Sequence, residues 1–192
     1  MGKSIALFGT SADPPTIGHK KILEELSRIY TFTISFVSNN PNKKHKEDIT
    51  IRSHLLKTLI EDLDNPKILF NQRVSSQWAV ESIKKCKEIY GFNNLDFVIG
   101  SDLIKDILYW KNFDKIIKEV SFLIILRKGY PVESNTLKML ETYKVKFKIS
   151  SIKIPNISSS KFRLNFNYSN LPKSLIDIVK KNNLYESSKL GE

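Results

Sequence analysis

The fold is decided by one stretch near the N-terminus, Ile5-Ala6-Leu7-Phe8-Gly9-Thr10-Ser11-Ala12-Asp13-Pro14-Pro15-Thr16-Ile17-Gly18-His19. An apolar run ends at Gly9, and a polar turn leads to Thr16-x-Gly18-His19, where a helix is predicted to begin. A turn between a buried strand and a helix N-terminus is typical of a phosphate site, because free N–H groups and the positive end of the helix dipole point at it. Thr16 and His19 would share one face of that helix, and Gly18 leaves the backbone between them bare.

Two common phosphate motifs are excluded at this position. No G-x-G-x-x-G follows the first apolar run, and the spacing from Gly9 to Gly18 does not fit G-x-x-x-x-G-K-[ST], since Lys20 is followed by another lysine. An ordinary helix cap followed by a first-turn histidine would give the same Thr16 and His19. These two residues alone therefore leave both interpretations open.

Length and composition bound the class of protein. The 192 residues are 41% hydrophobic and 27% charged, which predicts one globular domain over residues 1–192. No apolar run approaches the ~18 residues of a membrane span, and no signal peptide is visible, so we expect a cytoplasmic protein without membrane partners. The single cysteine, Cys86, excludes a disulfide framework and a cysteine zinc cluster.

The net charge of +11 raises the question of an anionic partner. The lysines are spread along the whole chain and do not gather in one arm or tail. This distribution favours solvated surface, so we expect no nucleic-acid partner, although a basic nucleic-acid-binding module stays open as an alternative class.

Apolar runs alternate with amphipathic stretches along the chain, which predicts an α/β fold. The expected architecture is a Rossmann-like, doubly wound parallel sheet of about five to six strands flanked by helices. The predicted strands are Ser4–Phe8, Phe32–Ser38, Ile68–Phe70, Asp96–Ile99, Ser121–Leu126 and Lys146–Ile152. The predicted helices are about Gly18–Ile29, Ile51–Leu63, Gln77–Tyr90, Leu103–Leu108 and Phe113–Glu119, with a C-terminal helical portion at about 158–186.

Polar, small or cationic residues follow five of the predicted strands, where a parallel sheet of this type binds its ligand. These segments are Gly9–His19, Asn39–Lys46, Gly100–Asp102, Arg127–Gly129 and Pro155–Arg163. In the last one, three serines before Arg163 predict a second helix N-terminus, at which hydroxyls and a guanidinium fork could hold phosphate. Taken alone, a plain serine cap beside a surface arginine explains the same residues.

Together the two helix starts resemble the nucleotidyltransferase superfamily, whose members carry T/H-x-G-H near the N-terminus and I-S-S-x-x-x-R near the C-terminus. Over its whole length the chain is similar to the bacterial nicotinate-nucleotide adenylyltransferase family. The matching segments are Ser11–His19, Pro41–Lys46, Arg52–Leu56, Gly100-x-Asp102 with Trp110, Arg127-x-Gly129-Tyr130, Leu171-Pro172 and Leu184-Tyr185.

The resemblance implies transfer of the adenylyl group of ATP to nicotinate mononucleotide, giving deamido-NAD and pyrophosphate in NAD biosynthesis, with Mg²⁺ bridged through ATP oxygens. It implies catalytic roles for Thr16, His19 and Arg163. The residues it implies for ATP binding are Gly9, Thr10, Ser11, Gly18, Lys46, Gly100, Asp102, Ile157, Ser158, Ser159 and Ser160. Those it implies for the pyridine nucleotide are Trp78, Ala79, Trp110 and Arg127. Homo-oligomer formation is left open.

Several residues depart from the family pattern. Ala12 replaces a phenylalanine, Thr16 the more frequent first histidine and Phe162 the usual isoleucine. Gln77-Trp78-Ala79 stands where Ser-Tyr-Thr is usual, in the segment that would distinguish a carboxylate from a carboxamide. Nicotinamide mononucleotide, and a sibling adenylyl- or cytidylyltransferase such as phosphopantetheine adenylyltransferase, therefore remain alternatives.

Overall fold

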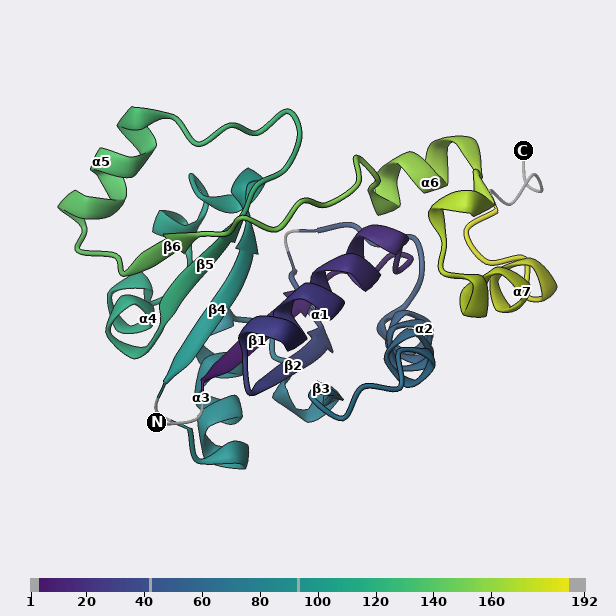
Figure 1. Ribbon diagram of the computed structural model, residues 1–192, viewed down its shortest axis with the longest axis horizontal. Helices are drawn as coiled ribbons and strands as arrows, with labels where there is room; N and C mark the ends of the chain where they lie inside the picture. The colour runs from purple at the N-terminus through teal and green to yellow at the C-terminus, as the bar shows by residue number, and fades with distance from the viewer. Residues whose placement is uncertain (1–3, 42, 93, 187–192) are drawn as a thin grey trace.

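A six-stranded parallel sheet forms the centre of the protein in the computed structural model, which describes residues 4–41, 43–92 and 94–186 (Figure 1). The strands are β1 (Ile5–Thr10), β2 (Phe32–Val37), β3 (Ile68–Phe70), β4 (Leu95–Gly100), β5 (Ser121–Ile125) and β6 (Phe147–Ile149). They are ordered β3-β2-β1-β4-β5-β6, and every adjacent pair is parallel. This is the doubly wound order in which ligands bind where the connections diverge, here between β1 and β4, and it confirms the predicted fold class.

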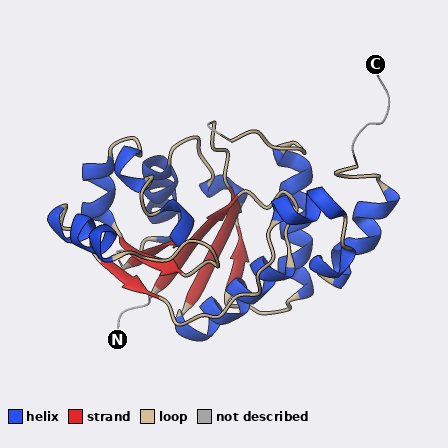
Figure 2. Ribbon diagram, turned by 90° about the horizontal axis from the view of Figure 1, so that it is seen from above, coloured by secondary structure: helices blue, strands red, loops and turns tan. Residues whose placement is uncertain are grey.

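Helices cover both faces of the sheet (Figure 2). They are α1 (Ile17–Ile29), α2 (Ile49–Asp62), α3 (Ala79–Tyr90), α4 (Phe113–Glu119), α5 (Ser134–Thr142), α6 (Ser159–Asn165) and α7 (Lys173–Lys181). α1, α2, α6 and α7 contribute to the core on one face, and α3, α4 and α5 to the core on the other. In the described ranges, none of these helices combines the length and the apolar character needed to cross a bilayer.

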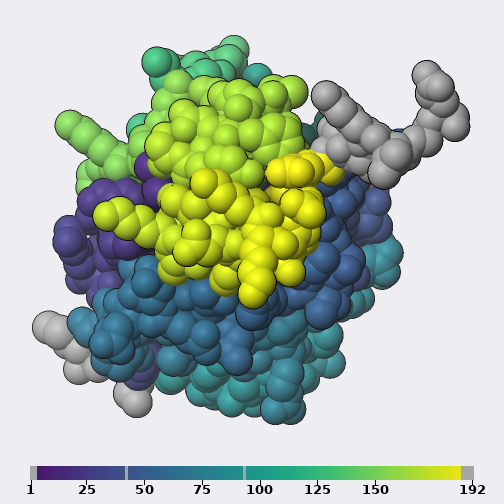
Figure 3. Space-filling model, turned by 90° about the vertical axis from the view of Figure 1, so that its right-hand side faces the viewer, coloured from purple at the N-terminus to yellow at the C-terminus, as the bar shows by residue number. Residues whose placement is uncertain are grey.

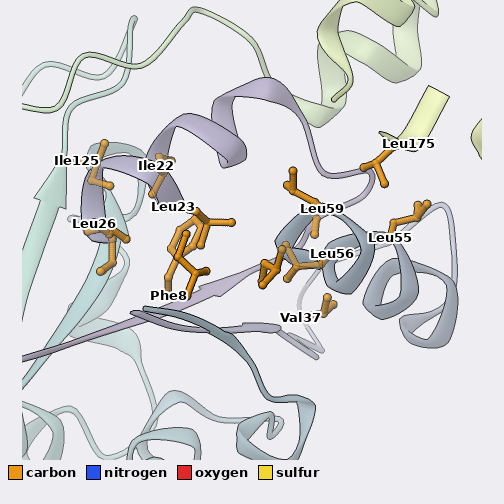
Figure 4. Close-up of a cluster of buried hydrophobic side chains, with 14 of the residues drawn as sticks. Phe8, Ile22, Leu23, Leu26, Val37, Leu55, Leu56, Leu59, Ile125 and Leu175 are labelled. Carbon is orange, nitrogen blue, oxygen red and sulfur yellow. The ribbon is translucent and has the colours of Figure 1, made fainter. Parts of the chain in front are cut away.

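β1 is buried on both faces, which explains its continuous apolar sequence. Ile5 and Leu7 join the core under α3, while Ala6 and Phe8 join the core under α1 and α2. On that second face, Leu23 of α1 and Leu56 of α2 pack beside Phe8 (Figure 4). Full burial of one such leucine contributes about 1.5–3 kcal/mol, so this layer fixes α1, and with it the start of α1, against the sheet.

The C-terminal helices extend the α2 side of the molecule. Leu175 and Val179 of α7 are fully buried in the same core as α2. Beyond α7, the backbone N–H of Tyr185 donates to Glu47 Oε1 at 2.8 Å, so the C-terminal segment is tied to the loop before α2. Figure 3 shows this yellow segment lying on the blue surface of the α2 region.

One predicted helix was wrong and one helix was missed. The expected helix Leu103–Leu108 is replaced by two 3₁₀ turns, Ser101–Leu103 and Ile107–Tyr109. Ile104, at the end of the first turn, and Ile107, at the start of the second, are both buried, so the segment packs on the core through two isoleucines without forming a continuous helix. Helix α5 was not predicted, because only Thr136 and Leu140 of its nine residues are buried and the sequence signal is sparse.

Several helices and strands also begin or end at residues other than those predicted. α2 begins at Ile49 because Asp48 caps it, with Asp48 Oδ1 accepting the N–H groups of Thr50 and Ile51 at 2.6 and 3.0 Å. α3 begins at Ala79 rather than Gln77, and β6 is shorter than predicted.

Candidate active site

His19 lies in the first turn of α1 between two threonine side chains. The Thr16 N–H donates to His19 Nδ1 at 3.0 Å, and Thr16 Oγ1 lies 2.9 Å from the same nitrogen. His19 Nε2 lies 2.9 Å from Thr10 Oγ1 at the end of β1. Because a backbone N–H can only donate, Nδ1 is the acceptor, and the neutral ring carries its proton on Nε2. The ring therefore presents one N–H toward the end of β1.

The protonation state of His19 follows from its surroundings. The side chain is 7% exposed, and burial, followed by the positive charge of Arg127, lowers its pKa from 6.5 to about 3. The imidazole is therefore neutral at physiological pH, and the field that it feels favours an incoming anion.

The start of α1 meets the C-terminal motif through Gly18. A Cβ on Gly18 would lie 3.3 Å from Thr16 Oγ1 and 3.4 Å from the carbonyl oxygen of Ile157, so the two segments are in close contact at this glycine. A different contact, with the ring of Phe36, requires glycine at position 9. A Cβ there would lie 2.7 Å from the ring of Phe36, so Gly9 serves the packing of β1 on β2.

Helix α6 lies against the loop that precedes α1. Ser159 Oγ donates to the carbonyl oxygen of Pro14 at 2.8 Å. Arg163 Nη1 donates to the carbonyl oxygen of Asp13 and lies 3.4 Å from Asp13 Oδ2, while Nη2 lies 3.4 Å from Ser160 Oγ. Ser158 caps α6, since its Oγ accepts the N–H of Lys161 at 3.2 Å. The two predicted phosphate segments are thus side by side.

Asp13 is a buried carboxylate at this junction that the sequence analysis did not single out. It is 2% exposed, and its oxygens accept the backbone N–H groups of Lys46 and Glu47 at 2.8 and 3.2 Å. His45 Nδ1 lies 3.8 Å from Asp13 Oδ2. Asp13 thereby connects the loop after β2 to the loop after β1, and the Lys46 side chain is left exposed.

Arg52 of α2 is also buried, at 2% exposed. Its Nε donates to the carbonyl oxygen of Glu47 at 3.0 Å and its Nη1 to that of Ser11 at 2.7 Å. Sequence reasoning noted Arg52 as part of a motif but gave it no role. The signal was present, because Arg52 precedes Leu55, Leu56 and Leu59 by three, four and seven residues and so falls on the buried stripe of α2.

The ends of β4 and β5 bring Asp102 and Arg127 together. Arg127 Nη1 donates to Asp102 Oδ2 at 3.0 Å, and Asp102 Oδ1 is buried without a hydrogen-bond partner. Ser101 Oγ accepts the Arg127 N–H at 2.9 Å and donates to the carbonyl oxygen of Tyr130 at 2.7 Å. A Cβ on Gly100 would overlap Asp102 Oδ1 and lie 3.0 Å from Arg127 Nε, so glycine leaves the room that this pair occupies.

The residues predicted for the pyridine nucleotide occupy different surroundings. Trp78 is the N-cap residue of α3, directly before Ala79, and Lys111 Nζ lies 4.8 Å from the centre of its ring. Trp110 packs edge-on against Phe97 and Phe122, with ring centres 5.8 and 6.4 Å apart. Trp110 is therefore partly a core residue, whereas Trp78 stands at the start of a helix beyond the carboxyl end of β3.

The donor set at this edge suits phosphate oxygens. It consists of hydroxyls, one neutral imidazole and two guanidinium groups, and both nearby carboxylates, Asp13 and Asp102, already accept hydrogen bonds. In the described part of the chain, no three His, Cys, Asp or Glu side chains gather as a metal-binding group.

Comparisons with known proteins agree with this geometry. The sequence model of the cytidylyltransferase-like family matches residues 7–165. A probable nicotinate-nucleotide adenylyltransferase of Synechocystis is 30% identical over 146 residues, which cover 71% of this chain and 73% of that protein. The nicotinate-nucleotide adenylyltransferase of Bacillus subtilis is 28% identical over 194 residues, covering 96% of this chain and 100% of that protein.

A solved structure extends the likeness to three dimensions. The nicotinic acid mononucleotide adenylyltransferase of Plasmodium falciparum, complexed with NaAD, superposes with a TM-score of 0.78 at 25% identity. The match covers 95% of this chain and 97% of that one. The chain therefore belongs to the nicotinate-nucleotide adenylyltransferases, within the cytidylyltransferase-like family.

Proposed function

We propose that this protein transfers the adenylyl group of ATP to nicotinate mononucleotide, forming deamido-NAD and releasing pyrophosphate. The observation that carries the proposal is the junction of α1 and α6, where Gly18 meets Ile157 and Ser159 binds the Pro14 carbonyl. Two helix N-termini that converge in this way suit the several phosphates of one nucleotide better than a single phosphate. The NaAD complex of the Plasmodium relative supports the same reaction class.

The chemistry needs no protein nucleophile. A phosphate oxygen of the mononucleotide attacks the α-phosphorus of ATP in line. The bond between the α-phosphorus and the oxygen that bridges it to the β-phosphorus breaks, and pyrophosphate leaves with that oxygen. Catalysis then consists of positioning the two anions and stabilising the charge that develops between them.

His19 is assigned to the transferred phosphoryl group, and the two threonines hold its ring in the free protein, Thr16 at Nδ1 and Thr10 at Nε2. The neutral ring carries its proton on Nε2, where Thr10 Oγ1 is its partner at 2.9 Å. An incoming phosphate oxygen would take the place of Thr10 as the acceptor, and its negative charge would raise the pKa of the imidazole. Thr16 keeps the ring oriented through Nδ1, which makes His19 a fixed donor rather than a free cation.

The start of α6 is assigned to the departing phosphates. Ser159, Ser160 and Arg163 supply hydroxyls and a guanidinium fork, and Lys46 adds an exposed ammonium from the loop after β2. Mg²⁺, held by the ATP oxygens, would neutralise part of the charge on the triphosphate and on the leaving pyrophosphate. Asp102, whose side chain is 22% exposed, is assigned to a ribose hydroxyl.

The preference for nicotinate is proposed from the start of α3. The first N–H groups of this 12-residue helix, next to Trp78, can donate to a carboxylate, and the acidic side chain in the first turn, Glu81, is paired with Lys111 at 4.0 Å. Trp78 offers a part-exposed aromatic ring at the same place.

One assay tests the reaction and its specificity together. Purified protein with Mg²⁺-ATP is offered nicotinate mononucleotide, nicotinamide mononucleotide or phosphopantetheine in separate reactions, and pyrophosphate is measured. We expect release with nicotinate mononucleotide at a kcat/KM at least tenfold above that with nicotinamide mononucleotide, the scale of about 1.4 kcal/mol of discrimination. Faster release with phosphopantetheine, or none with either mononucleotide, would reject the proposal.

A further inference from the structure

We propose that Asp13 is a positioning residue for ATP, and that its buried negative charge holds two cationic segments at the site of the β- and γ-phosphates. This inference rests on the proposed function, because it assigns those phosphates to the start of α6 and the loop around Lys46. Asp13 contacts both segments, which lie 33 and 150 residues further along the chain.

The first segment is the loop that carries His45 and Lys46. Its backbone is bound to the Asp13 carboxylate through two N–H groups, at 2.8 Å from Lys46 and 3.2 Å from Glu47. Hydrogen bonds to a carboxylate are roughly twice as strong as those between neutral groups. The carboxylate therefore fixes the backbone from which the two basic side chains start, while the Lys46 side chain remains exposed to a ligand.

The second segment is α6 with Arg163. Arg163 Nη1 bonds to the Asp13 carbonyl and lies 3.4 Å from Asp13 Oδ2, which holds the guanidinium plane by one of its edges. The side chain is still 28% exposed. A guanidinium has five N–H donors in a rigid fork, so one edge can be anchored while others face a phosphate.

Asp13 does not bind phosphate in this account. A buried carboxylate would repel an anion if it were uncompensated, but here two amides and a guanidinium neutralise it. The net effect is orientation. Without the charge, the loop and Arg163 would each have to be ordered by ATP, at a cost in binding affinity.

The test compares two aspartates in one chain. Asp13→Asn removes the charge with almost no change of shape. Asp96→Asn is the matched control, because Asp96 has a side chain only 15% exposed, accepts from Tyr30 Oη at 2.6 Å and pairs with Lys148, but lies at the opposite end of the parallel strands. Steady-state pyrophosphate release gives KM for each substrate and kcat, and calorimetry with Mg²⁺-ATP alone gives Kd for ATP.

We expect Asp13→Asn to raise KM and Kd for ATP at least about tenfold, as for the loss of a charge-assisted contact, with a smaller change in kcat and in KM for the mononucleotide. Asp96→Asn should leave all these values within about threefold. If Asp13→Asn lowers kcat alone, with both KM values and the Kd for ATP unchanged, Asp13 does not position ATP and the proposal is overturned.

Two further outcomes are also decisive. If Asp13→Asn does not fold, Asp13→Ser replaces it, since the serine hydroxyl can still accept one amide but carries no charge. Failure of both variants to fold assigns Asp13 to stability alone and overturns the proposal. If the wild-type protein binds ATP but releases no pyrophosphate, the proposed function fails, while a weaker Kd for ATP in Asp13→Asn still supports the positioning role.

Discussion

Acid should destabilise this protein through one histidine. His19 has a pKa of about 3 in the folded state, because of burial and then Arg127, against 6.5 for a free imidazole. Between these two pH values the unfolded chain binds a proton that the folded chain excludes. Above pH 6.5 the free energy of unfolding is unaffected by this difference in proton binding. As the pH falls below 6.5, the free energy of unfolding decreases by about 1.4 kcal/mol per pH unit, and the decrease is complete near pH 3.

The perturbation is a change from pH 7 to pH 4, applied to wild type and to His19→Gln. The glutamine oxygen can still accept the Thr16 N–H, but the side chain does not titrate. Wild type should lose about 3 kcal/mol more unfolding free energy than the variant over this interval. Burial also lowers the pKa of His45, but His45 is present in both proteins and its contribution cancels.

Urea unfolding at both pH values measures the difference directly. Nuclear magnetic resonance gives an independent value, since the chain has three histidines and the ring of His19 should not titrate between pH 8 and pH 4. Equal acid sensitivity of the two proteins, or a His19 titration near pH 6.5, would refute the assignment of a buried, neutral ring.

Three further outcomes can be checked in the pyrophosphate assay. His19→Ala should lower kcat by about 10²–10³, the typical effect of removing one charge-stabilising donor, with an unchanged far-ultraviolet spectrum, and wild-type turnover would remove His19 from catalysis. Arg163→Lys should raise KM for ATP about tenfold, because an ammonium cannot hold Asp13 and a phosphate in one plane, and an unchanged KM would contradict this role. Gly100→Ala should displace Asp102 and lower kcat/KM about tenfold, while the unfolding free energy changes by less than about 1 kcal/mol because only side-chain ends must move; normal kinetics would show that the pair relaxes without consequence.

The sequence predicted the layers of the fold well where burial is continuous. β1 is covered on both faces, so its apolar run was unambiguous, and the leucine stripe of α2 matches its buried face. Prediction failed where local structure depends on few buried residues. α5 buries two side chains, and the segment after β4 buries two isoleucines three residues apart, a spacing that fits an α-helix and a 3₁₀ turn equally well.

The candidate site divides in the same way. Thr16, His19 and the serines before Arg163 were found because helix starts have a local signature of caps and glycine. Asp13 was missed because its partners lie 33 and 150 residues away, and no periodicity encodes such contacts. The roles assigned to the individual site residues stay predictions until the variants above are measured.

The buried cysteine gives the fold a chemical reporter of its own. Cys86 lies in α3 with 1% of its surface exposed, and burial raises the pKa of its thiol to about 12. Because the thiolate is the reactive form, a thiol reagent at neutral pH should modify Cys86 only in molecules whose α3 has detached from the sheet. The chain has no other cysteine, so the labelling rate would time the opening of this one helix without an engineered probe. If nicotinate mononucleotide binds at the start of α3, it should lower the rate at which Cys86 is labelled, and ATP alone should lower that rate less.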